Sequence, residues 1–175
     1  MLIIFSGLPG VGKSTVARAL AFKIKATFLR IDSLEHALVE SKLVEEANEI
    51  GPAGYMAAYA LAADNLRLGM PVVADSVNPL TITRDAWRET ALKNDSNYLE
   101  IEVKCSNPVE HRKRVELRQA DIPGFILPTW TDVLKREYQA WNRDHLVLDT
   151  FELSVDQALN LILEKLNDLS SAPSD

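Results

Sequence analysis

The stretch that decides the fold is Gly7-Leu8-Pro9-Gly10-Val11-Gly12-Lys13-Ser14-Thr15. It matches the pattern G-x-x-x-x-G-K-[ST], the phosphate loop or Walker A motif. The apolar run Leu2 to Phe5 in front of it reads as a buried strand. Behind it, apolar residues recur at every fourth position and form one face of a helix, at Val16, Leu20 and Ile24. The order strand, glycine loop, helix is the context that this motif requires.

Each residue type in the loop suits a triphosphate. Its three glycines lack a Cβ atom, so the backbone can turn tightly and point its N–H groups inward. Lys13 is a compact cation for the β- and γ-phosphates, and the Ser14 hydroxyl suits Mg²⁺. A turn that binds nothing would not need this lysine beside a serine. We therefore expect Gly7 and residues 9–15 to bind ATP with Mg²⁺, and the glycine order G-x-x-G-x-G excludes a dinucleotide fingerprint.

The bulk composition limits the classes of function. The chain has 175 residues, 47% of them hydrophobic and 25% charged, which predicts one globular domain. A net charge of −6 argues against broad attraction to nucleic acid or to anionic membranes. Cys105 is the only cysteine, which excludes a disulfide within the chain. No apolar run approaches the ~20 residues of a membrane span, and no signal peptide is recognised, so we expect a cytoplasmic protein.

Strands and helices are predicted to alternate along the chain, which indicates an α/β fold with a mostly parallel sheet and helices on both faces. Two helix starts carry capping residues, Asn107 before Pro108 and Ser154 before Gln157, and Gly69 suits a helix end. A single domain is expected over 1–169, with a frayed tail over 170–175. Strands are expected at 2–5, 27–31, 71–75, 98–105 and 145–148, and the later helices at 84–92 and 130–141.

Two carboxylates follow strands at the sheet edge where ligands bind. Asp75 ends the third strand in a Walker B arrangement, so we expect it to hold Mg²⁺ together with Ser14. A turn-forming aspartate is the alternative. Asp32 follows the second strand, where a general base would orient an acceptor hydroxyl and take its proton. Asp32-Ser33-Leu34-Glu35 also reads as a helix capping box, and the two roles are compatible.

A basic cluster lies between Lys104 and Arg118, where five cations and two anions give a net charge of +3. Arg114 and Arg118 are four residues apart and are expected on one helix face, which leads into a Pro-Gly break. We predict a small lid at about 112–128 whose arginines neutralise a transferring phosphoryl group. A solvated helix face is the alternative. The predicted catalytic residues are thus Lys13, Asp32, Arg114 and Arg118.

Other polar and aromatic residues allow two interpretations each. Arg84 could hold an anionic acceptor or lie on the surface. Tyr55 and Tyr59 could line an acceptor pocket, although core packing is the expected role. The three histidines share no spacing typical of metal ligands and are expected to be structural.

Together these residues resemble the small P-loop kinases, in particular the polynucleotide-kinase-like and chloramphenicol-phosphotransferase-like branch. The resemblance rests on the phosphate loop, Asp32, the run Asp75-Ser76-Val77-Asn78 and the pair Arg114 and Arg118. It implies a five-stranded parallel sheet in the order 2-3-1-4-5, ATP with Mg²⁺ as donor, a base at Asp32 and lid arginines. It also implies that adenine lies near the lid helix and residues 149–151. The chain departs from the family at Val77, where relatives often carry a threonine.

The leading hypothesis is a kinase that transfers the γ-phosphoryl group of ATP to a hydroxyl of a small molecule or of a nucleic-acid end. The alternative is a regulatory ATP-binding module or a simple ATPase, in which Asp32 is only a helix cap. The net charge of −6 argues against binding along an extended nucleic acid, so among nucleic acids we expect only an end as substrate. The acceptor and the oligomeric state stay open, and residues 33–70 are expected to form the acceptor pocket.

Overall fold

The computed structural model describes residues 1–42 and 50–171. Its strands form one parallel sheet in the order β2-β3-β1-β4-β5, which confirms the predicted topology. Because all strands are parallel, their carboxyl ends meet at one edge of the sheet. The strands are β1 (Leu2–Ser6), β2 (Thr27–Arg30), β3 (Val72–Asp75), β4 (Tyr98–Lys104) and β5 (Leu146–Asp149).

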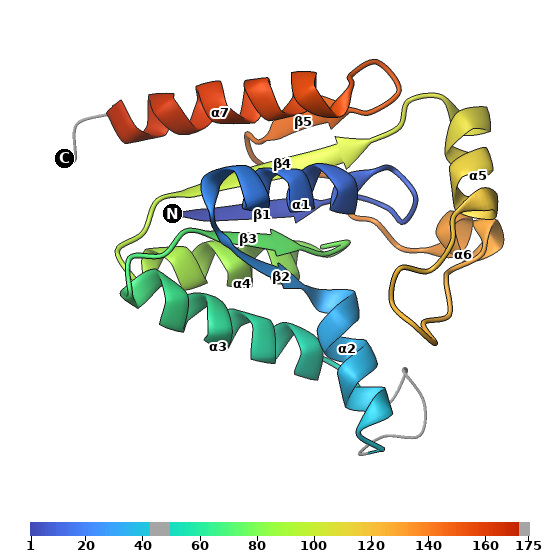
Figure 1. Cartoon of the computed structure of the whole chain (residues 1–175), viewed down its shortest axis with the longest axis horizontal. Helices are drawn as coiled ribbons and strands as arrows, with labels where there is room; N and C mark the ends of the chain where they lie inside the picture. The colour runs from blue at the N-terminus through green and yellow to red at the C-terminus, as the bar shows by residue number, and fades with distance from the viewer. Residues whose placement is uncertain (43–49, 172–175) are drawn as a thin grey trace.

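The helices form two layers around this sheet (Figure 1). α1 and α7 cover one face and α3 and α4 the other, while α5 and α6 lie beyond the carboxyl ends of the strands. The helices are α1 (Lys13–Ile24), α2 (Ile31–Glu40), α3 (Ala53–Arg67), α4 (Thr81–Leu92), α5 (Pro108–Leu117), α6 (Trp130–Lys135) and α7 (Val155–Ser171). This architecture fits the single domain expected over residues 1–169, which stays a prediction.

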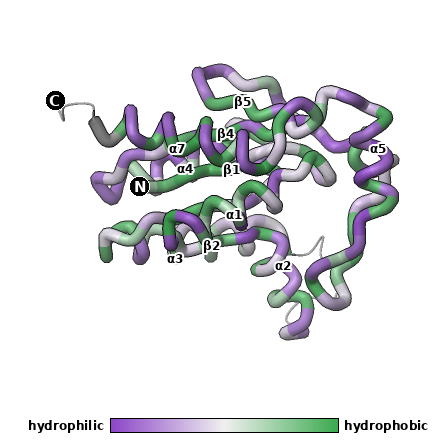
Figure 2. The backbone as a smooth tube through the Cα atoms, turned by 45° about the horizontal axis from the view of Figure 1, so that its top comes forward, coloured by the Kyte–Doolittle hydropathy of each residue, from purple (hydrophilic) through white to green (hydrophobic). Residues whose placement is uncertain are grey.

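Strand β1 is buried on both faces, as its unbroken apolar sequence predicts. Ile3 and Phe5 pack into the core beneath α1 and α7, whereas Leu2 and Ile4 pack into the core beneath α3 and α4. α7 covers one of these two cores, and Figure 2 shows that hydrophobic and hydrophilic residues alternate along this helix. Within the described ranges, no helix combines the length and the apolar character needed to cross a bilayer.

The two helix starts that were predicted from capping residues, at Asn107 and Ser154, are confirmed. The Asn107 side chain accepts hydrogen bonds from the N–H groups of Val109 and Glu110, at 3.0 Å each, and Pro108 takes the first helical position. Ser154 and Gln157 exchange two hydrogen bonds at the start of α7. Such caps act through neighbouring backbone atoms, and this is why they can be recognised without the fold.

Other boundaries differ from expectation. The helix predicted over 130–141 ends at Lys135, because residues 136–141 turn back against the loop after β3, where the Gln139 N–H donates to Pro79 O at 2.8 Å. The helix expected from Arg84 begins earlier, at Thr81. Two expectations fall partly outside the described residues: the acceptor stretch 33–70 includes residues 43–49, and the frayed tail includes residues 172–175.

Candidate active site

The loop between β1 and α1 needs glycine for two separate reasons. Gly7 and Gly10 have φ angles of +142° and +84°, which side chains of L-residues rarely adopt. A Cβ atom on Gly7 would lie 2.3 Å from the carbonyl oxygen of Val103, and one on Gly10 would lie 2.4 Å from Cγ2 of Val115. The loop therefore sits tightly against β4 and α5 at the carboxyl edge of the sheet.

The start of α1 offers an anion site. Gly12 is the N-cap and α1 begins at Lys13, so the N–H groups of the first turn have no acceptor within the helix. The first of them to bond back is that of Val16, which donates to Gly12 O at 3.3 Å. The Ser14 side chain is partly exposed at this end. Free N–H groups and the helix dipole together favour a phosphate here.

Lys13 and Asp75 form a buried ion pair behind the loop. The Lys13 ammonium contacts Asp75 Oδ1, and the two residues are only 8% and 1% exposed. Asp75 Oδ2 is also buried and has no hydrogen-bond partner among the described residues. Sheet pairing aligns Asp75 with Phe5 of β1 and Arg30 of β2. The structure thus brings together two charged residues that the sequence indicated separately.

Asp32 is not the helix cap that the sequence allowed. The N-cap of α2 is Arg30, which makes no capping hydrogen bond through its side chain, and Asp32 falls inside the first turn. The predicted capping box is therefore wrong, because the chain already enters the helix at the buried residue Ile31. The Asp32 carboxylate instead lies 3.5 Å from Nη2 of Arg30, and its side chain is 37% exposed.

Arg30 joins three carboxylates and was missed in the sequence. Its Nη1 donates to both oxygens of Asp121, at 2.8 and 2.9 Å, and its Nη2 faces Asp32. Its Nε lies 4.0 Å from Asp75 Oδ2. Burial opposes its charge, but the hydrogen bond to Asp121 and the charge of Asp32 raise the pKa of Arg30. The available signal was a cation at the end of an apolar strand.

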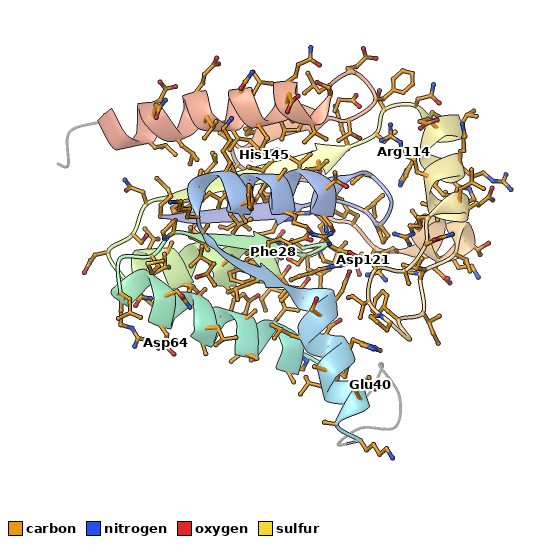
Figure 3. The ribbon with its side chains drawn as sticks, viewed as in Figure 1. Phe28, Glu40, Asp64, Arg114, Asp121 and His145 are labelled. Atoms are coloured by element: carbon orange, nitrogen blue, oxygen red, sulfur yellow. The ribbon has the colours of Figure 1, made fainter. Side chains whose placement is uncertain are left out.

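The irregular residues 118–129 between α5 and α6, here called the lid segment, contact three parts of the sheet edge. Asp121 accepts from Arg18 of α1 at 2.5 Å as well as from Arg30, and Figure 3 shows it beside the end of β2. Burial opposes the effect, but the hydrogen bonds from Arg18 and Arg30 lower the pKa of Asp121 to about 2. Further along, the Phe125 ring meets His36 of α2 edge-on, with 6.0 Å between centroids.

The two predicted lid arginines lie in different places. α5 ends at Leu117, and Arg118 follows it with extended backbone angles, so the expected shared helix face is wrong. Arg118 donates to Pro128 O at 3.1 Å. Burial lowers the pKa of Arg118, and so does the charge of Arg30, while that of Asp32 opposes them. Arg118 therefore belongs to the Asp32 side of the site.

Arg114 belongs to the other side, near the loop after β5 (Figure 3). It donates to Glu110 at 2.9 Å, to the Thr150 hydroxyl at 2.9 Å and to the Thr150 carbonyl at 3.2 Å. The Thr150 hydroxyl in turn donates to the carbonyl of Val11 at 2.6 Å. Arg114 is thus tied to the phosphate loop through a single residue of the loop after β5.

A cleft of about 410 Å³ opens between α5 and the lid segment. Arg118 forms part of its wall, as does Val115, which also approaches Gly10 of the phosphate loop. The other lining residues are Arg112, Glu116, Leu127, Pro128, Thr129, Trp130 and Thr131.

Arg84 serves the fold rather than a ligand. It is 1% exposed, its Nε donates to Asn78 O at 2.9 Å, and its Nη2 donates to Gln139 O at 2.8 Å. The guanidinium carbon lies over the rings of Tyr138 and Trp141, 4.9 and 4.3 Å from their centroids. Both sequence interpretations, acceptor binding and a surface position, are wrong. Arg84 holds residues 136–141 against the loop after β3.

The two tyrosines of α3 both pack against the core beneath α3 and α4. Tyr59 packs edge-on against Trp87, 4.6 Å between centroids, and donates to the carbonyl of Thr83 at 3.2 Å. Tyr55 accepts from the N–H of Asn78 at 3.4 Å, and burial raises its pKa to about 12. Core packing is therefore confirmed for both tyrosines, and Tyr55 also contacts the loop that follows Asp75.

Glu35 is a second residue that sequence reasoning missed. It lies one turn after Asp32 on α2 and is half-buried, because Gly54 of α3 packs on its stem. A Cβ at position 54 would lie 2.5 Å from Glu35 Cγ. Burial and the charge of Asp32 raise the pKa of Glu35 to about 7, against the opposing charge of Arg136. The signal available in the sequence was the i, i+3 spacing of two carboxylates.

The chain is similar to curated kinases along nearly its whole length. The L-seryl-tRNA(Sec) kinase of Methanococcus maripaludis is 26% identical over 173 residues, which cover 94% of this chain and 65% of that protein. The "Probable bifunctional SAT/APS kinase 2" of Sorangium cellulosum is 25% identical over 183 residues, covering 97% of this chain and 29% of the relative. The chain thus spans less than two thirds of the length of either relative.

A solved structure, the Mycobacterium tuberculosis APS kinase in complex with AMPPNP and APS, shares the fold with a TM-score of 0.71 at 20% identity. The match covers 95% of this chain and 96% of that one. Residues 2–125 match the AAA domain family, a range that contains the phosphate loop, Asp32, Asp75, Arg114 and Arg118. The resemblance to small P-loop kinases is confirmed, and the chain belongs to this AAA domain family.

Proposed function

We propose that this protein is a kinase that transfers the γ-phosphoryl group of Mg·ATP to a hydroxyl group of an acceptor. One observation carries the proposal. At a single sheet edge, a phosphate loop backed by the Lys13–Asp75 pair is linked through Arg30 to Asp32, a carboxylate that does not cap its helix. A module that only binds ATP has no need of this further carboxylate.

The nucleotide would bind along the phosphate loop. The N–H groups of residues 9–15 would hold the phosphates, and Lys13 would neutralise their β- and γ-oxygens. Arg114 and Thr150 form the wall on the side where we expect adenine, next to residues 149–151. The names of the two curated relatives and the AMPPNP held by the M. tuberculosis enzyme support ATP as the donor.

Ser14 and Asp75 fit a magnesium ion. Asp75 Oδ2 is a buried carboxylate oxygen without a hydrogen-bond partner in the described part of the chain, and the Ser14 side chain is partly exposed at the helix start. Mg²⁺ is usually held by one or two protein oxygens together with phosphate oxygens and water, so a pair of ligands is sufficient. When bound, the ion would neutralise charge on the phosphates.

In the proposed reaction, Asp32 orients the acceptor hydroxyl and takes its proton. The hydroxyl oxygen forms a bond to the γ-phosphorus as the bond from that phosphorus to the β,γ-bridging oxygen breaks, which leaves ADP. Arg118, on the Asp32 side of the site, would neutralise charge on the transferring group. The lid segment would keep competing water out of the site.

The class of acceptor is narrower than the fold alone allows. The net charge of −6 argues against broad electrostatic attraction to a polyanion, which favours a small hydroxyl-bearing molecule over a long nucleic acid. A nucleic-acid end remains compatible with a local site. The curated relatives are named for different acceptors, so their similarity does not choose between these two.

Replacing Asp32 with asparagine tests the proposal. Wild-type protein should release ADP in response to at least one member of a panel of hydroxyl-bearing metabolites and 5′-hydroxyl oligonucleotides. Asp32→Asn should lower that turnover by about 10²-fold or more while calorimetry shows unchanged Mg·ATP affinity. Asp64→Asn, on the exposed face of α3, is the matched control. Steady ADP release that no acceptor changes would instead support a simple ATPase.

A further inference from the structure

Arg30 is the most deeply buried arginine among the ion pairs of the described residues, followed by Arg143 at 19% exposed. Its side chain is 11% exposed, whereas those of Arg18, Arg67 and Arg112 are 58%, 62% and 60% exposed. Burying a guanidinium is costly unless opposing charges surround it. Arg30 meets this condition with three carboxylates from three separate segments of the chain.

The three carboxylates have three different places in the proposed site. Asp75 ends β3 and is the expected metal ligand, Asp32 lies in the first turn of α2, and Asp121 belongs to the lid segment. Arg30 contacts all three within 4.0 Å. Each of its nitrogens serves a different neighbour: Nη1 holds Asp121, Nη2 faces Asp32, and Nε faces Asp75.

The contact between Nε and Asp75 is incomplete. Arg30 Nε and Asp75 Oδ2 are both buried, and neither has a hydrogen-bond partner among the described residues. They lie 4.0 Å apart, too far for a hydrogen bond. The strong bonds of Arg30 are those to Asp121, so its position is set mainly from the lid segment.

From this geometry we propose that Arg30 is a positioning residue for phosphoryl transfer: it orients Asp32 and couples that orientation to closure of the lid segment through Asp121. When Asp121 holds Nη1, the planar guanidinium fixes where Nη2 meets Asp32. If the lid segment opens, Arg30 loses its strongest partner, and the orientation of Asp32 relaxes with it. The inference rests on the proposed function, because it assigns a task to Asp32.

The coupling would favour transfer to the acceptor over hydrolysis of ATP by water. If the base Asp32 is held in place only beneath a closed lid segment, it promotes transfer only when water is excluded. Asp121 also accepts from Arg18, but that arginine is exposed and touches neither Asp32 nor Asp75 in the described contacts. Loss of Arg18 would therefore remove one exposed contact of Asp121 and leave both hydrogen bonds from Arg30 to Asp121 in place.

The test compares Arg30→Met, Asp121→Asn and Arg18→Met in acceptor-dependent ADP release, with Mg·ATP as the donor and, as the acceptor, the panel member that stimulates wild-type turnover. Arg30→Met should lower kcat by about 10²-fold, the size expected when a reacting group is misplaced, with the calorimetric Kd for Mg·ATP changed by less than about threefold. Asp121→Asn should lower kcat to a similar extent, and the double variant should be no worse than Arg30→Met alone. Arg18→Met should change kcat by about twofold at most.

Hydrogen exchange separates this role from a purely structural one. With Mg·AMPPNP bound, residues 118–129 should exchange faster in both Arg30→Met and Asp121→Asn than in wild type, while the sheet stays protected. Wild-type kcat in Arg30→Met, or additive losses in the double variant, would overturn the Arg30 assignment and leave the proposed function intact. A wild-type protein that binds no Mg·ATP would overturn both.

Discussion

At the scale of single residues, Glu35 shows how packing changes the chemistry of a carboxyl group. Its ordinary pKa of 4.5 rises to about 7, chiefly through burial and then through the charge of Asp32. Between these two values the folded protein keeps a proton that the unfolded chain releases. The contribution of Glu35 to stability is therefore present below about pH 4.5 and is lost as the pH rises to about 7.

Glu35→Gln should flatten this part of the stability profile. Above pH 7 the variant should be more stable than wild type by about 1 kcal/mol, a value reduced from the full shift because the side chain is partly exposed. At pH 4 the two should have equal stability. Urea unfolding from pH 4 to pH 8 measures the difference, with the exposed Glu164→Gln on α7 as control. Parallel profiles for Glu35→Gln and wild type would contradict the assignment.

Long-range contacts explain why single charged residues were the hardest to predict. Lys13 and Asp75 are 62 residues apart, and Arg30 and Asp121 are 91 apart. No periodicity connects such positions, so the sequence indicated Lys13 and Asp75 only through separate motifs. Arg30 has no motif and became visible only when β2 paired with β3. Arg118 was assigned to a helix face because its spacing from Arg114 is helical, although α5 ends one residue earlier.

At the scale of elements, local signals predicted most of the fold. The caps at Asn107 and Ser154 and the apolar face of α1 act through neighbouring atoms, so they hold in any context. The predicted end of α6 was wrong, because Arg84 holds residues 136–141 through a hydrogen bond and through the rings of Tyr138 and Trp141. This tertiary effect overrides the helical spacing of the sequence. The sheet order followed from the family resemblance rather than from the spacing of the strands.

The phosphate loop makes a prediction at this scale. Gly10 and Gly69 both have positive φ angles, +84° and +76°, but only Gly10 has a neighbour in the way of a side chain, Val115. Gly69→Ala should cost about 1 kcal/mol through backbone strain alone. Gly10→Ala should cost at least about 2 kcal/mol, because the branched Val115 side chain cannot move aside easily, and it should weaken Mg·ATP binding.

Thermal unfolding and calorimetry measure these two effects. Adding Val115→Ala to Gly10→Ala should recover part of the Mg·ATP affinity, since it removes the clashing methyl group. Equal stability losses at positions 10 and 69 would show that the loop does not pack tightly on α5.

At the scale of the whole molecule, the sheet edge concentrates charge that the overall composition conceals. The chain carries a net charge of −6, yet the phosphate loop, the end of β2, α5 and the start of the lid segment bring cations to one edge. These are Lys13, Arg30, Arg114 and Arg118. Short-range contact with such cations, rather than net charge, can hold a polyanion on an acidic protein. The parallel topology is the cause, since it gathers all strand ends at that edge (Figure 1).

The measurement that tests this account most directly is a calorimetric titration of Mg·ATP into wild type, Lys13→Ala and Lys23→Ala. Lys23 is an exposed lysine in the last turn of the same helix and serves as the matched control. Circular dichroism first checks that each variant is folded, because Lys13 is paired with the buried Asp75. We predict that wild type and Lys23→Ala bind equally and that Lys13→Ala binds at least about tenfold more weakly, a loss of about 1.4 kcal/mol. No heat from wild type, or equal binding by all three proteins, would contradict the account.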